Sequence, residues 1–242
     1  MHDLIGFSIE AHGGLARWNQ LGQISASFIP GGLSFKQRGQ EAFTRQRTRV
    51  TVDTREQRAV YVPFLGSGQS AIFEPKRTAI AASDGTILEE LNNPRESFRD
   101  MGTPWSATQL AYFAGYAMWM YLTMPFSLVG DGIETEEIGS WAEDGETWRA
   151  LKLKFPKSFV THSTEQTLYF DSNGLIRRHD YAVEIFGGRK ATHYRYDHRA
   201  TEGITFSHKR RVHLPDAEGR PKMDTVMISI DLDELELLRV AP

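Results

Sequence analysis

Histidines are the side chains of this sequence that could serve most kinds of chemistry, because imidazole titrates near neutral pH and ligates metals. Residues i and i+2 of a strand share a face, so His193, Arg195 and Asp197 are expected on one side of a strand. A base beside a carboxylate could perform acid–base chemistry. The alternative is that these are solvated or hydrogen-bonded strand residues. The histidines of the C-terminal strands are His179, His193, His198, His208 and His213, and Tyr194, Tyr196 and His198 are expected on the opposite face.

Motifs for metal, nucleophilic or phosphate chemistry are absent from the sequence. There is no cysteine and no His-x-His or His-Glu-x-x-His spacing, so we expect no metal site. Ser67 lies between Gly66 and Gly68 but lacks the Gly-x-Ser-x-Gly pattern of a nucleophile elbow. The carboxylates Glu134 and Glu136 follow a turn and fit a solvated strand edge. We therefore expect no catalytic residue and no cofactor.

Arginines form the clearest charged row. Arg45, Arg47 and Arg49 alternate along an expected strand from Thr44 to Val52 and would share one face. One interpretation is a solvent face paired with carboxylates. The other is a cationic rim that holds a lipid headgroup or a fatty-acid carboxylate. Arg177-Arg178 and Lys209-Arg210-Arg211 offer the same two interpretations with weaker support.

An uncharged, aromatic segment runs from Met101 to Gly130. It predicts a helix from Trp105 to Met124 that ends at Pro125 and follows a short helix from Arg95 to Met101. The long helix is apolar over most of its circumference, which indicates burial. Its aromatic and methionine side chains could either fill a core or line a cavity for an apolar ligand. The residues predicted to line such a cavity are Phe113, Tyr116, Trp119, Met120 and Phe126.

The same segment is long enough to cross a bilayer, but Pro104, Gln109 and several hydroxyl residues interrupt it, so we expect no integral membrane span. The net charge of −3 argues against nucleic-acid binding. The first residues show neither the basic nor the apolar region of a secretory signal. This predicts a cytoplasmic protein, or a periplasmic one if a leader has been removed. A protein partner is left open.

Outside the helical segment the sequence reads as strands. In the clearest case Leu151 and Leu153 alternate with Lys152 and Lys154. About a dozen such strands are joined mostly by tight turns, which predicts a mainly β fold with one curved antiparallel sheet. We expect residues 1–242 to form a single half-barrel domain wrapped around a helical insertion at about 94–124. Further expectations are a helix over Asp3–Ala11, a turn at Gly31-Gly32 followed by a strand through Leu33 and Phe35, and a strand from Phe126 to Val129.

Four segments together resemble a known family. They are Ala11-His12-Gly13-Gly14-Leu15-Ala16-Arg17-Trp18, Tyr121-Leu122-Thr123-Met124-Pro125-Phe126, Leu168-Tyr169-Phe170-Asp171-Ser172-Asn173-Gly174-Leu175, and the run from Tyr196 through Gly203 to Ile204. In this order the chain resembles the LolA/LolB-like lipoprotein-carrier superfamily, and more closely its uncharacterised half-barrel relatives. The resemblance implies an incomplete antiparallel barrel around helices, with a hydrophobic cavity for acyl chains. The chain departs from the family in lacking a leader and in having Phe206-Ser207-His208 where related sequences often have a proline.

Two functions are consistent with these features. The first is non-enzymatic binding or carrying of an apolar or amphipathic ligand, such as a lipid or fatty acid, between sheet and helices. The second is a hydrolase or isomerase that uses the same pocket with strand His and Asp residues. The second needs two titratable groups within hydrogen-bond reach inside the cavity.

Overall fold

One antiparallel sheet dominates the computed structural model, which describes residues 2–99 and 103–240. Thirteen strands of these residues pair in the order β6-β5-β4-β3-β2-β1-β13-β12-β11-β10-β9-β8-β7. The strands are β1 (Leu21–Phe28), β2 (Thr48–Asp53), β3 (Ala59–Val62), β4 (Gln69–Glu74), β5 (Arg77–Ala82), β6 (Ile87–Asn92), β7 (Glu134–Glu143), β8 (Glu146–Lys154), β9 (Glu165–Phe170), β10 (Ile176–Val183), β11 (Arg189–Thr201), β12 (Ile204–His213) and β13 (Ile228–Arg239). Because β6 and β7 lie at opposite ends of this order, the sheet is curved but not closed.

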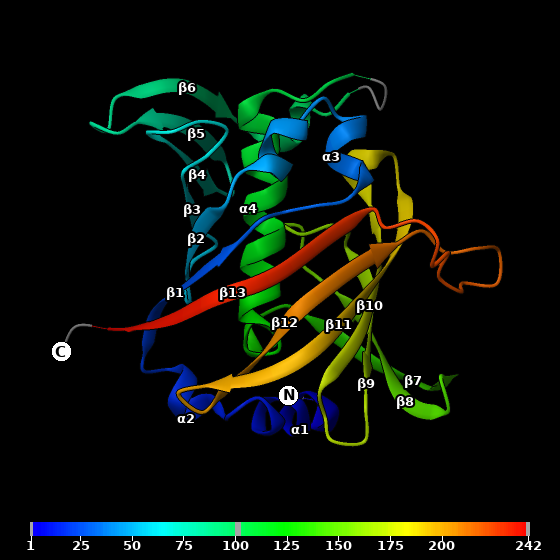
Figure 1. Ribbon diagram of the computed structural model, residues 1–242. Helices are drawn as coiled ribbons and strands as arrows, with labels where there is room; N and C mark the ends of the chain where they lie inside the picture. The colour runs from blue at the N-terminus through cyan, green and yellow to red at the C-terminus, as the bar shows by residue number, and fades with distance from the viewer. Residues whose placement is uncertain (1, 100–102, 241–242) are drawn as a thin grey trace.

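The helical elements lie inside and at the ends of this sheet. They are α1 (Asp3–Ala11), α2 (Leu15–Trp18), α3 (Leu33–Gln37), α4 (Ala107–Thr123) and the 3-10 turns η1 (Glu41–Arg45), η2 (Pro94–Ser97), η3 (Phe126–Val129) and η4 (Glu184–Phe186). Figure 1 shows the sheet wrapping around α4, with α1 beneath the lower end of the half-barrel. Strand β1 joins the two halves, because it pairs with β2 on one side and with β13 on the other. The predicted mainly β half-barrel around a central helix is confirmed.

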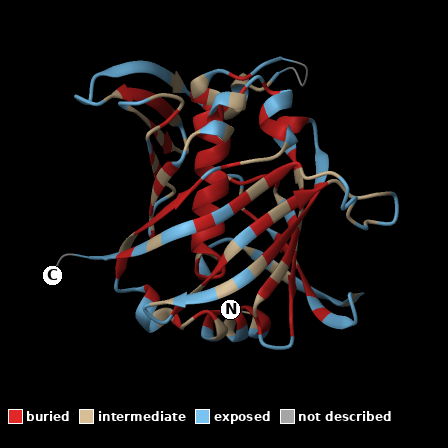
Figure 2. Ribbon diagram, viewed as in Figure 1, coloured by how far each residue is buried: buried red, intermediate tan, exposed pale blue. Residues whose placement is uncertain are grey.

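Helix α4 is the centre of the hydrophobic core. Every residue from Leu110 to Thr123 is buried, and Figure 2 shows the helix buried along most of its length while the strands alternate. Gly115 lets the helix backbone approach β4, since a Cβ there would meet the Cβ and Cγ of Phe73 far inside van der Waals contact. The Tyr61 hydroxyl donates a 2.8 Å hydrogen bond to the Ala114 carbonyl. The helix is therefore fixed against the N-terminal half of the sheet.

A capping box begins α4. The Ser106 hydroxyl accepts from the Gln109 amide at 3.1 Å, and the Gln109 side chain accepts from the Ser106 amide at 3.0 Å. These bonds satisfy two backbone donors that a helix start otherwise leaves unpaired. We expect Ser106→Ala to lower the free energy of unfolding by about 1 kcal/mol in urea titrations. Ser140→Ala, on the exposed strand β7, is the control and should leave it unchanged; equal losses in both would contradict the capping role.

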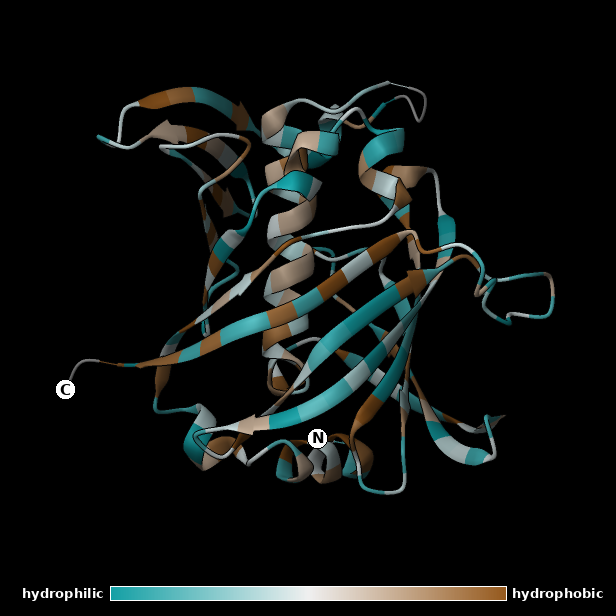
Figure 3. Ribbon diagram, viewed as in Figure 1, coloured by the Kyte–Doolittle hydropathy of each residue, from teal (hydrophilic) through white to brown (hydrophobic). Residues whose placement is uncertain are grey.

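Local patterns predicted several elements correctly. Helix α1 has the predicted bounds and buries Leu4, Ile5 and Ile9. Strand β8 buries Leu151 and Leu153 and turns Lys152 and Lys154 outward. Alternating hydropathy along the strands is visible in Figure 3.

Three sequence predictions about the N-terminal half and the end of α4 are wrong. Leu33 and Phe35 lie in helix α3 rather than in a strand, and Gly31 pairs with Ser229 of β13 instead of closing a hairpin. Residues Phe126–Val129 form the turn η3 rather than a strand. In each case a short apolar run fits both conformations, and contacts distant in sequence decide between them.

The remaining boundary differences concern the segments beside α4 and before β2. The short helix predicted for Arg95–Met101 is the turn η2, which has Pro94 in its first turn, and Met101 lies outside the described residues. The strand predicted from Thr44 begins only at Thr48, because Glu41–Arg45 form the turn η1.

Candidate functional site

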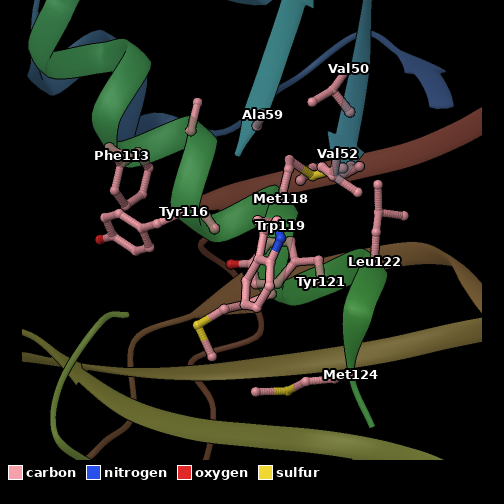
Figure 4. Close-up of a cluster of buried hydrophobic side chains, with 14 of the residues drawn as sticks. Val50, Val52, Ala59, Phe113, Tyr116, Met118, Trp119, Tyr121, Leu122 and Met124 are labelled. Atoms are coloured by element: carbon pink, nitrogen blue, oxygen red, sulfur yellow. The ribbon is translucent and has the colours of Figure 1, made fainter. Parts of the chain in front are cut away.

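The aromatic residues predicted to line a cavity are all buried around α4, and Figure 4 shows several of them. Most are already engaged with protein atoms. The Trp119 indole donates to the Asp53 carbonyl at 2.8 Å. The Phe126 ring stacks on Trp18 at 4.2 Å, and the Met120 sulfur accepts from the Thr161 hydroxyl at 2.6 Å. Of the five, only Phe113 borders the crevices described next.

Two apolar crevices run along α4 and share Phe113, Tyr121 and Ile228 in their walls. The first lies toward the C-terminal half of the sheet, and the second toward the N-terminal half. The space that the centre of a water molecule can reach is only about 30 Å³ in the first and about 20 Å³ in the second. The crevices are therefore narrow seams in a well-packed core, and an acyl chain would enter by displacing side chains. Further wall residues are Val183, Phe186, Ala191, Val212 and Leu214 in the first crevice, and Phe28, Phe35, Phe43, Tyr61 and Met118 in the second.

Polar groups also border the first crevice. Arg189 and Lys190 are exposed at the start of β11, where they could meet an anionic group at the surface. Deeper in the crevice lies His162. The more spacious hollow on the sheet, about 450 Å³ and bordered by Lys152, Asp180 and Gly219, is open and more polar. The crevices beside α4 are thus the better match for an apolar ligand.

His162 lies at the centre of a buried tyrosine cluster that sequence analysis missed. Its ring hydrogen-bonds the Tyr116 hydroxyl at 3.2 Å and stacks on Tyr181 at 3.9 Å. The Tyr121 hydroxyl lies 3.2 Å from that of Tyr181. Burial, aided by the charge of Arg95, lowers the pKa of His162 to about 3. The imidazole is therefore neutral near pH 7 and acts as a hydrogen-bonding part of the core.

A row of polar side chains crosses the inner face of β10, β11 and β12. His179 is the cross-strand partner of His193, and Arg195 is the cross-strand partner of Arg210. All four are buried. The His179 ring bonds the Gln166 amide oxygen at 2.5 Å, and Arg210 donates to the Tyr121 carbonyl at 2.7 Å. Burial lowers the pKa of His179 and of His193 well below the usual value.

Asp197 does not share the face of His193 and Arg195, so this sequence prediction is wrong. Its φ of 54° turns the side chain out of the alternating pattern, and its carboxylate pairs with Arg199 at 2.6 Å on the surface. The opposite face agrees better with expectation, since the Tyr194 and Tyr196 rings stack at 5.9 Å. The predicted His–Asp neighbourhood is therefore absent from the described interior.

The other strand histidines have backbone partners. His198 bonds the Ile176 carbonyl at 3.1 Å and His213 bonds the Thr225 carbonyl at 3.0 Å. His208 lies 3.4 Å from the Leu232 carbonyl. Across the described residues, no group of three or more His, Cys, Asp or Glu side chains is arranged to hold a metal ion.

The arginine row lies on the outer face of the sheet. Arg47 pairs with Asp233 at 3.0 Å, and Arg49 pairs with Glu234 and Glu236 of β13 at 3.0 and 2.8 Å. Val50 and Val52 point inward from the same strand. Arg45 does not share that strand face, because it lies in η1 and pairs with Glu41 at 3.5 Å. This geometry corresponds to the solvent face with carboxylate partners, away from the crevices beside α4.

The fold has clear counterparts among solved structures, although no protein-family model and no curated protein matches this sequence. A LolA superfamily protein from Nitrosomonas europaea is similar, with a TM-score of 0.56 and 11% identity over 99% of this chain and 94% of its own. A domain described as an outer membrane lipoprotein-sorting protein from Vibrio parahaemolyticus gives 0.55 and 9% over 97% and 91%. The chain has a LolA-like fold. A DUF1329 family protein from Desulfovibrio piger, at 0.54 and 11% over 97% and 92%, is similar over the same extent.

The resemblance read from the sequence is thus confirmed at the level of the fold. In this LolA-like fold the crevices lie between the sheet and the central helix, where the family resemblance predicts an acyl-chain cavity. Among the helices of the described residues, none combines the length and apolarity needed to cross a bilayer.

Proposed function

We propose that this protein binds or carries an apolar or amphipathic, lipid-like ligand between the sheet and α4, with residues 1–242 acting as one unit. The observation that carries the proposal is the pair of apolar crevices that meet at Phe113 and Tyr121 along the central helix. The LolA-like fold supports it, since one similar structure is described as a lipoprotein-sorting domain. Methionines beside these crevices, such as Met118, adapt their shape to different apolar partners.

The energetics are adequate for such a ligand. Burying about ten methylene groups contributes on the order of 8 kcal/mol before the costs of association. A gross gain of about 8 kcal/mol corresponds to a dissociation constant of about 1 μM. The association costs and the displacement of wall side chains therefore leave the net affinity of a ten-carbon chain weaker than micromolar. A ligand of moderate affinity that can be released again suits a carrier.

The hydrolase or isomerase alternative has weaker support. Acid–base catalysis by histidine needs a partner that orients the ring and balances its charge. Within the described residues, the side-chain partners of His162 and His179 are tyrosine hydroxyls and the Gln166 amide. Binding therefore agrees better with the interior than proton transfer does.

The proposal is tested by filling the first crevice. We expect the protein to bind an environment-sensitive apolar dye, and long-chain fatty acids to displace it. Ala191→Phe places a ring in the crevice and should weaken dye and fatty-acid binding at least tenfold, as followed by fluorescence titration. Ala142→Phe, on the exposed strand β7, is the matched control and should bind as the parent protein does. Equal binding by both variants and the parent would contradict the proposed site.

The natural ligand can be sought directly. Native mass spectrometry of protein purified from cells, followed by organic extraction, should show a co-purifying lipid-like molecule. No dye binding together with no extracted lipid would refute the carrier function.

A further inference from the structure

Two buried arginines face each other on the inner side of the sheet. Arg195 of β11 and Arg210 of β12 are direct cross-strand partners, and each residue is only 2% exposed. Side chains at such positions are about 5 Å apart at Cβ, and like charges placed there destabilise a sheet. Burying an unpaired charge adds a further cost. A folded protein that keeps this pair needs something that offsets the repulsion.

The protein itself supplies little of that compensation. Arg195 donates through Nη2 to the Met124 sulfur at 3.3 Å, a weak acceptor. Within the described part of the chain, Arg210 donates only through Nη2, to the Tyr121 carbonyl. Among the described residues, Arg195 Nε, Arg210 Nε and Nη1, His179 Nδ1 and both ring nitrogens of His193 lack a hydrogen-bond partner. In the described part of the chain, no Asp or Glu carboxylate makes an ion pair with Arg195 or Arg210. Guanidinium N–H groups of both arginines and one N–H of neutral His193 therefore lie in one buried place without a bonded acceptor. His179 Nδ1 is an unpaired acceptor, because Nε2 of its neutral ring donates to Gln166.

Burial also shifts the pKa values of these groups. It lowers the pKa of Arg195 to about 10, and it lowers the pKa of Arg210 with the charge of Arg195 as a second cause. Arg195 is thus still protonated at pH 7. The neighbouring imidazole of His193 is neutral, because burial and both guanidinium charges lower its pKa. A neutral imidazole offers one N–H donor without adding charge.

Tyr121 connects this cluster to the apolar crevices. The Arg210 guanidinium lies 5.0 Å from the centre of the Tyr121 ring, and the His193 ring lies 4.5 Å from it. The same tyrosine borders both crevices. Neither arginine nor His193 is itself a wall residue of the two crevices, so Tyr121 is the wall side chain that separates a chain in either crevice from this cluster.

We propose that Arg195, Arg210 and His193 bind the anionic headgroup, a carboxylate or a phosphate monoester, of an amphiphile whose chain lies along α4. This rests on the proposed function and adds the class and the orientation of the ligand, headgroup inward. Guanidinium groups suit such headgroups because their planar N–H pairs match two oxygens at once. A neutral lipid of equal length would leave the buried donors unpaired and bind more weakly.

The test compares ligands that share a chain and differ in the headgroup: decanoate, decyl phosphate and 1-decanol, with inorganic phosphate as the chain-free probe. By isothermal titration at pH 7.5, we expect the parent protein to bind one or both anionic amphiphiles at least tenfold more tightly than 1-decanol. Inorganic phosphate should bind at least tenfold more weakly than the preferred amphiphile. Arg195→Met should remove most of the preference while leaving 1-decanol binding unchanged.

The controls separate this inference from simple folding defects. Arg195→Met removes an unpaired buried charge and leaves no backbone acceptor without its donor, so its melting temperature should equal or exceed that of the parent. Arg49→Met, on the outer face, should keep the full preference for anions.

Several outcomes would overturn the inference. Equal binding of decanol and both anions by the parent protein would refute the headgroup site but keep the proposed function, whereas binding of none would refute both. Loss of the preference in an Arg189→Met and Lys190→Met double variant, with Arg195→Met unaffected, would place the headgroup at the crevice mouth. Inorganic phosphate binding as tightly as decyl phosphate would make a free oxyanion the ligand.

Discussion

Acidification from about pH 7.5 to 4.5 is expected to lower the free energy of unfolding by about 3 kcal/mol through His162 alone. Burial holds the pKa of His162 at about 3 in the folded protein, against 6.5 when exposed. Between these two values the unfolded chain binds a proton that the folded protein excludes, so stability falls as the pH falls below 6.5. At pH 4.5 two pH units of this interval have been crossed, at about 1.4 kcal/mol each.

Urea unfolding at the two pH values measures this effect. His162→Gln keeps a hydrogen-bonding group beside Tyr116 and should lose about 3 kcal/mol less on acidification than the parent protein does. Ser140→Ala, at an exposed position on β7 that does not titrate, should show the same loss as the parent. If His162→Gln and the parent have the same pH dependence, His162 titrates normally and the enclosed tyrosine cluster is wrong. The other histidines whose pKa burial lowers, namely His12, His179, His193 and His198, add to the total loss but are unchanged in both variants.

Elements with a strong local pattern could be predicted from the sequence. The uncharged helix, the alternation in β8 and the N-terminal helix each carry a periodicity that one conformation explains. Leu33–Gln37 shows the limit, because Leu33 and Phe35 alternate as in a strand yet form α3. Here the backbone of Leu33 and Ser34 bonds to carbonyls of Val226 and Met227, almost two hundred residues away. No local pattern could reveal that partner.

The candidate site was predictable only in outline. The shared face of His193 and Arg195 follows from strand alternation, but the position of Arg210 opposite Arg195 depends on the register between β11 and β12. Asp197 was misplaced because its positive φ breaks the alternation locally. His162 lies in an irregular segment between strands, so no spacing in the sequence places it beneath α4.

The proposed headgroup site would make a tightly packed LolA-like interior selective for its ligand. Apolar walls attract many chains about equally, because the hydrophobic effect depends on area and not on direction. Unpaired donors at one end discriminate strongly, since they lose water without gaining a partner unless the ligand provides one. Such a site lowers the stability of the free protein, and the fold must compensate through tight packing elsewhere.

The contact between α4 and β4 is one place where the packing is tight. Gly115→Ala is expected to lower the free energy of unfolding by about 3 kcal/mol, at the upper end of the usual cost of overpacking a core. The added Cβ would lie 2.3 Å from the Cβ of Phe73, an atom whose position the backbone fixes, so no side-chain rotation can relieve the clash. Alanine favours a helix over glycine by about 1 kcal/mol, so a loss of stability requires the clash to exceed this gain.

The matched control is Gly66→Ala. Gly66 does not have the left-handed φ that favours glycine. Its added Cβ would have one neighbouring atom within 4 Å, the Gln69 side-chain oxygen at 4.0 Å. Its free energy of unfolding in urea should stay within about 0.5 kcal/mol of the parent value. If Gly115→Ala is as stable as the parent or more so, helix propensity outweighs packing, and α4 does not lie against β4 as closely as described. A large loss at Gly115 alone would establish that the central helix, and with it the crevices along its sides, is held in place by backbone contact with the sheet.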